Sequence, residues 1–267
     1  MDSINKVLGA FALLAVTLAA GIYIVRNGPA IDFKQPAQSA PEKPAQGAPE
    51  KPVAASAPIK PTTVAYSAPK TTPEAGFEPL FNGHDLSGWT GDTSDYSVEN
   101  GSLLYGGPGK GNLYTTKEYA NFHLRFDYKL TASADNGVGI RTPQTGDPGF
   151  VGMEIQLLDE SAERFREVAP WQSNGSLCGI VVAKQGFQKP VGEWNNQDII
   201  ARGTHFTVIL NGQVVVDAEI FDGSTPTLDD KSHPGMGRTS GYIALMGDTP
   251  RVEFRNIRLR DLGSSQP

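Results

Sequence analysis

One segment in the middle of the chain alternates between apolar and polar residues without exception. Phe122, Leu124, Phe126, Tyr128 and Leu130 occupy every second position, and polar or charged residues fill the places between them. Successive side chains of a β-strand point to opposite faces, so this pattern predicts a strand with one buried face. A helix would instead require an apolar period of about 3.6 residues. The alternation predicts a sheet that covers a core on one side.

Tight turns separate further short apolar runs. Asn211-Gly212 follows the alternating segment 206–210, and Asn100-Gly101 lies between two other short runs. Both residue types tolerate a positive φ, so these pairs are typical of two-residue hairpins. No segment after residue 76 has a long helical period. The sequence therefore predicts an all-β, antiparallel sandwich of two sheets, formed by residues 77–262.

The N-terminus predicts a membrane anchor. Val7 to Val25 form a run without charge, closed by Lys6 and Arg26. A bilayer-spanning helix needs roughly 20 such residues, whereas a cleaved signal peptide has a shorter apolar core. We therefore expect residues 1–26 to be a retained single-pass anchor, with a cleaved signal as the alternative. The sandwich is then expected to face the periplasm or the exterior.

A long linker follows the predicted anchor. Residues 27–76 are rich in Pro and Ala, and Ala-Pro-Glu-Lys-Pro occurs at 40–44 and again at 48–52. Frequent proline and sparse large apolar residues predict an extended, disordered spacer. The last five residues, 263–267, are expected to be a short tail.

Charge and cysteine content exclude several classes of protein. The formal net charge is −6, and no run of Lys or Arg is present. Nucleic-acid binding needs clustered positive charge, so no nucleic-acid partner is expected. Cys178 is the single cysteine, which excludes an internal disulfide and a thiolate metal cluster. Within its apolar run, this residue is more typical of a small buried side chain than of a catalytic thiol.

The segment 152–159 contains the strongest candidate for chemistry. As a strand, it places Glu154 and Gln156 on one face, roughly 7 Å apart, and apolar residues on the other. This pattern indicates a polar row on a sheet face where a sugar could lie; the alternative is an ordinary exposed face. Asp159 begins roughly 16 Å from Glu154, too far for the carboxylate pair of an ordinary glycosidase unless a bulge brings them together.

Other candidate residues have two interpretations each. Arg141 could bind a sugar hydroxyl or a carboxylate beside Glu154, or could form a structural salt bridge. Trp194 could stack on a sugar ring or lie in the core. The histidines have no ligand-like spacing and are expected on the surface or in loops. They are His84, His123, His205 and His233.

Several motifs, in order, resemble those of the 3-keto-disaccharide hydrolase family. The opening one is Leu80-Phe81-Asn82-Gly83-His84-Asp85-Leu86-Ser87-Gly88-Trp89. The others are Tyr119-Ala120-Asn121-Phe122, the segment 152–159, Gly192-Glu193-Trp194-Asn195, Leu210-Asn211-Gly212 and the segment 252–258. The resemblance covers essentially all of Phe77 to Leu262.

The resemblance implies a curved β-jelly-roll like that of concanavalin A-type lectins and glucanases. It also implies cleavage of the glycosidic bond of 3-keto sugars by elimination followed by hydration. A ketone at C3 acidifies the C2 proton, so one base can start the reaction, and a cation or hydrogen-bond donors can stabilise the enolate. The cofactor is undetermined, with a divalent cation as one candidate.

Site residues follow from the resemblance. Glu154 and Asp159 would act as acid, base or cation ligands, while Arg141 and Gln156 would orient the sugar. Three further residues would line the cleft: Asn136, Trp194 and Asn195.

The sequence departs from the family pattern at several positions. Asp135-Asn136-Gly137-Val138 stands where members carry Asn-Ser-Gly-Val, and Cys178 stands at a common Tyr. Met246 replaces a Gln, and Asp248 replaces a His. Asp248 could still bind substrate, a cation or a proton. These replacements keep a second function open, a lectin-like carbohydrate-binding module without catalysis, and, less strongly, a structural domain.

Overall fold

The computed structural model describes residues 75–221, 224–248 and 251–263. The predicted anchor (1–26) and nearly all of the predicted linker and tail lie outside these residues. Within the described part of the chain, no helix is long and apolar enough to span a bilayer.

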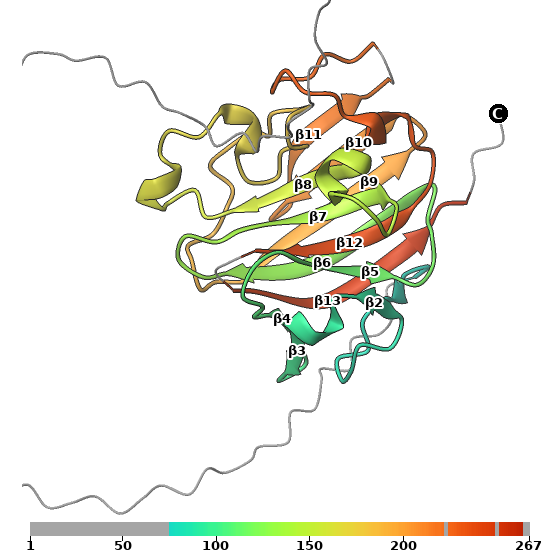
Figure 1. Ribbon diagram of the computed structural model, residues 1–267, viewed down its shortest axis with the longest axis vertical. Coiled ribbons are helices and arrows are strands. Elements are labelled where there is room, and N and C mark those ends of the chain that lie inside the picture. Colours follow the sequence, from blue (N-terminus) through green and yellow to red (C-terminus); the bar gives the residue numbers. More distant parts are fainter. Residues whose placement is uncertain (1–74, 222–223, 249–250, 264–267) are drawn as a thin grey trace, which may run out of the picture. The chain divides into compact units, whose positions relative to one another are not determined.

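The described residues form two antiparallel sheets stacked face to face (Figure 1). The larger sheet has the order β11-β10-β9-β6-β13-β4-β3, with β1 paired to β13. Its strands are β1 (Glu78–Pro79), β3 (Tyr96–Glu99), β4 (Ser102–Tyr105), β6 (Phe122–Leu130), β9 (Asn195–Arg202), β10 (His205–Leu210), β11 (Gln213–Glu219) and β13 (Val252–Asp261). The all-β antiparallel sandwich is confirmed, and the finer jelly-roll assignment stays a prediction.

The smaller sheet has the order β2-β5-β12-β7-β8. Its strands are β2 (Trp89–Gly91), β5 (Gly111–Thr115), β7 (Asp135–Thr142), β8 (Met153–Leu158) and β12 (Tyr242–Gly247). In β8, Met153, Ile155 and Leu157 belong to the core, whereas Glu154, which is half-buried, and Gln156, which is 5% exposed, line a cleft on the other face. The predicted alternation in this strand is therefore confirmed.

The core lies between the two sheets. The alternating segment forms β6, and its apolar residues are buried as predicted; they pack with residues such as Phe206 and Phe254 of the same sheet and Val138, Ile140 and Leu245 of the other. Burying one such side chain contributes about 1.5–3 kcal/mol to folding. Because the inner faces of both sheets are buried, the alternate side chains of each strand must point outward. These outward side chains are the ones available for a functional site.

The turns also follow the sequence. Asn211-Gly212 joins β10 to β11 with φ values of 50° and 83°, and Asn100-Gly101 joins β3 to β4 with 50° and 75°. Two successive positive φ values define the turn whose twist matches that of antiparallel strands. In β13, the pairing with β6 shifts between Arg255 and Arg258. This irregularity matches the phase change in the apolar pattern.

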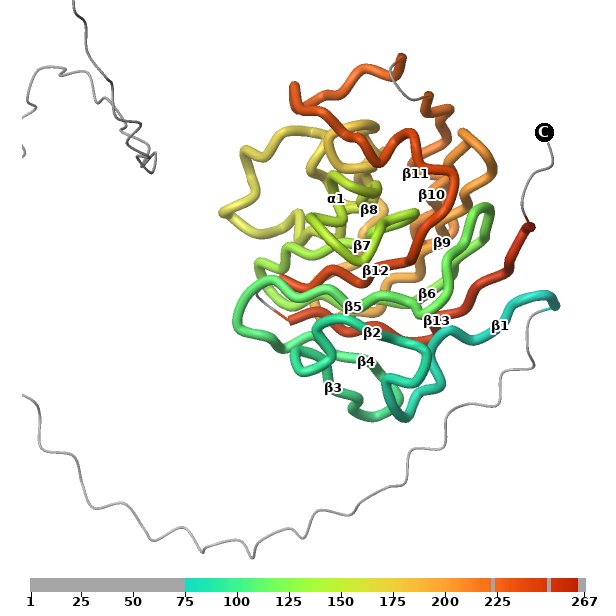
Figure 2. Tube along the Cα trace, turned by 45° about the vertical axis from the view of Figure 1, so that its right-hand side comes forward, coloured from blue at the N-terminus to red at the C-terminus, as the bar shows by residue number. Residues whose placement is uncertain are grey.

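Helices are short in the described residues. The longest α-helix there is α1 (Pro148–Val151), and the 3₁₀ turns are Thr93–Asp95, Glu163–Phe165, Pro170–Gln172 and Pro234–Gly237. Asp147 caps α1 by accepting a hydrogen bond from Gly149 N at 3.0 Å, and Pro148 opens the first turn. α1 lies beside β7 and β8 (Figure 2), where it forms one wall of the site described next.

Candidate active site

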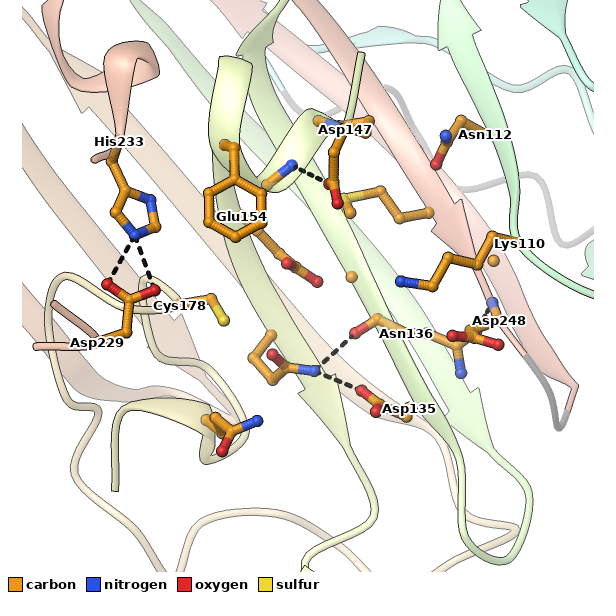
Figure 3. A pocket seen from close by; sticks show the side chains of 18 of the residues that line it. Lys110, Asn112, Asp135, Asn136, Asp147, Glu154, Cys178, Asp229, His233 and Asp248 are labelled. Atoms are coloured by element: carbon orange, nitrogen blue, oxygen red, sulfur yellow. Dashed lines mark hydrogen bonds and ion pairs between the residues drawn. The ribbon is translucent and has the colours of Figure 1, made fainter. Parts of the chain in front are cut away.

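A cleft of about 370 Å³ opens on the face of the smaller sheet that points away from the core. Its volume lies in the range of pockets that bind small molecules, about 300–1,000 Å³. Strands β7, β8 and β12 supply one side of it, and α1 and several loops supply the rest (Figure 3). Among the side chains that line it are those of Glu154 and Gln156, the residues that the sequence placed on one polar face.

Glu154 fits into the cleft because two neighbouring positions have no side chain. Glu154 pairs with Gly139 across β7 and β8, and its carboxyl lies over the next glycine along β7, Gly137. A methyl group on Gly137 would lie far inside the contact distance of Oε1, and one on Gly149 would lie 2.8 Å from Oε2. The carboxyl is therefore held between a strand and α1.

This environment changes the acidity of Glu154. Burial, followed by the negative charges of Asp135 and Asp147, raises the pKa of Glu154 from 4.5 to about 8, and the charge of Lys110 partly opposes this shift. A carboxyl with a pKa near neutrality is the arrangement that general acid–base catalysis favours. Once ionised, Glu154 is a much stronger base than an ordinary carboxylate.

Polar residues extend from Glu154 toward one end of the cleft. Gln156 Nε2 donates to Asp135 Oδ1 at 2.7 Å and to the carbonyl oxygen of Asn136 at 3.3 Å. Asp248 N donates to Asn136 Oδ1 at 2.9 Å. The predicted residues Gln156, Asn136 and Asp248 thus line the same cleft as Glu154 (Figure 3). Burial and then the charge of Asp248 raise the pKa of Asp135.

Two lysines line the cleft, and the sequence did not single them out. Lys110 is exposed and directs its ammonium group across the cleft toward Glu154 (Figure 3). It follows the segment Gly106-Gly107-Pro108-Gly109. Lys231 Nζ lies 5.3 Å from the centre of the Phe150 ring. No sequence motif predicted a role for these residues, because an isolated lysine in a loop belongs to no periodic pattern or spaced set of residues.

A histidine–aspartate pair forms part of the opposite wall. His233 Nε2 lies 3.1 Å from both carboxylate oxygens of Asp229, and the side chains are only 3% and 4% exposed. The imidazole stacks on Phe150 with ring centres 5.2 Å apart. His233 lies in the loop before the 3₁₀ turn Pro234–Gly237, in keeping with the expected surface or loop position, and its side chain is buried there. The sequence signal that could have indicated this pair is the position of Asp229 four residues before His233.

The structure places Arg141 away from the cleft. Its guanidinium group donates to the carbonyl oxygens of Ala120 at 3.0 Å, Gly203 at 2.8 Å and Arg238 at 3.2 Å. The side chain is buried, it lies over the Phe206 ring, and burial lowers its pKa to about 10. The expected position beside Glu154 is corrected: Arg141 ties three loops together by binding backbone oxygens.

Asp159 also lies outside the cleft, where its carboxylate binds backbone N–H groups. It is 2% exposed, and it accepts hydrogen bonds from Ser133 N at 2.7 Å and from Ser161 N at 3.0 Å. Since it does not line the cleft, the structure does not bring it together with Glu154. The carboxylates that do approach Glu154 electrostatically are Asp135 and Asp147.

Trp194 and Asn195 belong to the structural framework outside the cleft. Arg255 and Lys129 lie over the Trp194 ring, at 3.9 Å and 4.8 Å from its centre. Asn195 accepts hydrogen bonds from Lys189 N and Asn211 Nδ2, both at 2.8 Å. The tryptophan that lines the cleft is Trp171, in the 3₁₀ turn Pro170–Gln172.

The described residues also limit the assignment of a metal ion. Among them, no group of three or more His, Cys, Asp or Glu side chains is arranged to hold a cation. These residues therefore offer no set of ligands for the divalent cation that the resemblance left open. Cys178 lines the cleft, where burial and then the charge of Glu154 raise the pKa of its thiol. A protonated thiol is a poor nucleophile.

Solved structures share this architecture. One candidate glycosyl hydrolase from Parabacteroides distasonis is 28% identical, and the match covers 70% of this chain and 99% of that protein, with a TM-score of 0.62. A second from the same organism is 24% identical over 70% of this chain and 94% of its own, also with a TM-score of 0.62, and supports the fold alone. None of the curated proteins compared matches this chain.

Together, the sandwich, the cleft and these likenesses support a glycoside-acting enzyme, as the sequence predicted. The family is more specific. Residues 76–260 match the model of the 3-keto-alpha-glucoside-1,2-lyase-like domain, and the chain belongs to that family. The resemblance stated from the motifs is therefore confirmed.

Proposed function

We propose that this protein cleaves the glycosidic bond of 3-keto glycosides by elimination and then hydration. The observation that carries the proposal is the position of Glu154, a carboxyl that lines a sugar-sized cleft and has a pKa raised to about 8. Other carboxyls line that cleft, but the pKa of Glu154 suits a base rather than a permanently ionised nucleophile. One base suffices when a ketone activates the neighbouring C–H bond.

In the proposed reaction, ionised Glu154 removes the proton at C2. The electrons of the C2–H bond form a C1=C2 double bond, and the C1–O bond breaks toward the aglycone. The departing oxygen takes a proton from solvent, which reaches the open cleft. In the second step, water adds to C1 and releases a proton to solvent, while the carboxyl of Glu154, whose proton has exchanged with solvent in the open cleft, protonates C2. The net change is hydrolysis.

Negative charge develops on the C3 oxygen during the first step, and Lys110 is the group best placed to stabilise it. Its ammonium lies across the cleft from Glu154 (Figure 3), and its charge is strong enough at that distance to lower the pKa of Glu154. A preorganised cation facing a developing oxyanion is an effective source of transition-state stabilisation. Gln156 is held by Asp135, so it contributes a fixed amide to the surface on which the sugar lies.

The experiment compares the full chain with Glu154→Gln and the exposed control Glu193→Gln on a 3-keto disaccharide. We expect Glu154→Gln to lower kcat by about 10²–10⁴, the usual contribution of a general base, and Glu193→Gln to leave it unchanged. Equal rates for all three proteins would remove Glu154 from the mechanism. Saturable binding without turnover by the unmodified protein would instead favour the carbohydrate-binding module.

We also propose that residues 1–26 anchor the protein in the cell membrane and that the enzyme domain faces outward on its linker. The support is the uncharged run Val7 to Val25 and the Pro/Ala-rich sequence that follows it. Protease treatment of cells whose outer layers are permeabilised but whose cell membrane is intact tests the topology: we expect the domain to be released, and full protection would contradict an outward orientation.

A further inference from the structure

Trp171 differs from the other two tryptophans in how its ring is used. Trp89 Nε1 donates to the carbonyl oxygen of Leu80 at 2.8 Å, and two cations lie over the Trp194 ring. Trp171 is half-buried in the lining of the cleft, and its indole makes no hydrogen bond, ring contact or cation contact with the described residues. It is also not part of the apolar core. An aromatic side chain placed in this way has its surface available to a ligand.

The turn that carries Trp171 is fixed to the sheet. Ser173, whose side chain is buried, donates from Oγ to the carbonyl oxygen of Pro170 at 2.7 Å and so closes the turn. Gly175 N then donates to the carbonyl oxygen of Gln156, in β8, at 2.8 Å. The indole is therefore held in place before a ligand arrives, and binding to a preorganised surface costs little conformational entropy.

The other large aromatic ring in the cleft is already in contact with protein groups. Phe150 stacks on the imidazole of His233, with ring centres 5.2 Å apart, and Lys231 Nζ lies 5.3 Å from the centre of the Phe150 ring. Phe150 therefore supports the wall of the cleft. Trp171 is the better candidate for contact with a substrate.

The sheet sets the position of Trp171 relative to the reacting groups. β8 is the edge strand of the smaller sheet, whereas Lys110 directly precedes β5, and β12 and β7 lie between these two strands. Cys178 N donates to the carbonyl oxygen of Glu154 at 2.9 Å, so the segment after Trp171 runs along the outer edge of β8. Lys110 and Cys178 lie on opposite sides of Glu154 (Figure 3). Lys110, Glu154 and Trp171 thus follow one another across the cleft.

This order matches the order of atoms in the proposed substrate. Lys110 serves the C3 oxygen and Glu154 takes the proton from C2, so C1 and the aglycone lie on the side of Trp171. We propose that Trp171 forms the aglycone subsite and that the preferred 3-keto glycosides carry an aglycone with an apolar ring face, such as a second pyranose or an aromatic ring. The C–H bonds of such a ring pack against the electron-rich face of the indole. This inference rests on the proposed function, because it concerns the leaving half of the same substrate.

The test compares three 3-keto-glucosides of one anomeric configuration, whose aglycones are ethyl, 2-cyclohexylethyl and 2-phenylethyl groups. The three alcohols are of similar acidity, so the leaving oxygen is almost the same and only the ring differs. We expect kcat/KM of the full chain for the two ring-bearing substrates to be about 5–10-fold above that for the ethyl glucoside. The difference should lie mainly in KM, because the ring contacts Trp171 equally in the bound substrate and in the transition state.

Variants assign the effect to one side chain. Trp171→Ala should bring kcat/KM for the three substrates to similar values, and Trp171→Phe should keep part of the preference. Phe187→Ala, which removes an exposed aromatic ring outside the cleft, should keep all of it. Thermal unfolding verifies that each variant is folded.

Two kinds of failure can be told apart. A full chain that cleaves none of the three substrates contradicts the proposed function. If it cleaves them, equal kcat/KM values for all three would overturn the aglycone subsite. A ring preference that is undiminished in Trp171→Ala would overturn it as well.

Discussion

The carboxyl of Glu154 occupies the space that a side chain on Gly137 would fill. The two residues belong to neighbouring strands, and Oε1 lies over the glycine far inside the distance that any Cβ atom would require. This relationship explains why the strand can hold a carboxyl flat against the sheet, where burial and nearby carboxylates raise its pKa.

Gly137→Ala should therefore displace the Glu154 carboxyl and impair the reaction. We expect kcat to fall by about 10²-fold, as it does when a catalytic group moves by about an ångström. Gly106→Ala is the control, because a Cβ there meets nothing within 4 Å. A Gly137→Ala variant with full activity would show that the position of the carboxyl does not matter.

The rate should depend on the ionisation of Glu154. Because only the carboxylate can accept the C2 proton, kcat/KM should rise with pH and level off above an apparent pKa near 8. The residual activity of Glu154→Gln should lack this limb. A profile with no ascending limb between pH 6 and pH 9, measured on a 3-keto disaccharide, is incompatible with Glu154 as the base.

The same group should shape stability. Its folded-state pKa of about 8 lies above the unfolded value near 4.5, so the folded protein retains a proton that the unfolded chain loses between these limits. The contribution of Glu154 to stability is therefore full below pH 4.5 and is lost as pH rises toward 8. The Tm difference between Glu154→Gln and the unmodified protein should grow in favour of the variant over this window. Parallel Tm curves would contradict the raised pKa.

Lys110 should act on both the enolate and the base. Lys110→Met removes the charge that lowers the pKa of Glu154, so the apparent pKa of kcat/KM should move upward while kcat falls by about 10²-fold. Lys110→Arg keeps the charge and should recover part of both. A fall in kcat without a shift in the pH profile would place Lys110 away from Glu154.

Arg141 should be a stability residue. Arg141→Met removes the donor from the part-buried hydrogen bonds to the carbonyl oxygens of Ala120, Gly203 and Arg238, which should lower the free energy of unfolding by about 3 kcal/mol. Urea unfolding measures this loss. Activity per folded molecule should be unchanged, and a selective loss of kcat with normal stability would restore the catalytic interpretation.

The sequence predicted the strands and the polar face, because alternation and turn chemistry are local signals. The strand at Phe122 to Leu130 is predicted by its own apolar alternation, and the turn at Asn211-Gly212 by its own residue types. Glu154 and Gln156 could be placed for the same reason, since burying their neighbours forces them outward.

The remaining site residues depend on contacts between distant segments. Lys110, Asp147 and Asp229 come from separate loops that the folded sheet brings together. The position of Arg141 was predicted wrongly because a strand pattern gives the face on which a side chain lies. It does not show which backbone carbonyl oxygens of distant segments the side chain will bind. The predicted position of Trp194 in the cleft was wrong for the same reason. Its neighbours in the sequence could not show that Arg255 and Lys129 lie over its ring.

Deuterium incorporation at C2 tests the central claim most directly. The full chain is given a 3-keto disaccharide in D₂O, and the released keto sugar is analysed by NMR at short times against an enzyme-free control. Elimination and hydration through Glu154 predict one deuterium at C2 of every product molecule, and Glu154→Gln should form product and exchanged substrate about 10²–10⁴-fold more slowly. Released sugar that retains hydrogen at C2 would show direct hydrolysis and contradict the mechanism.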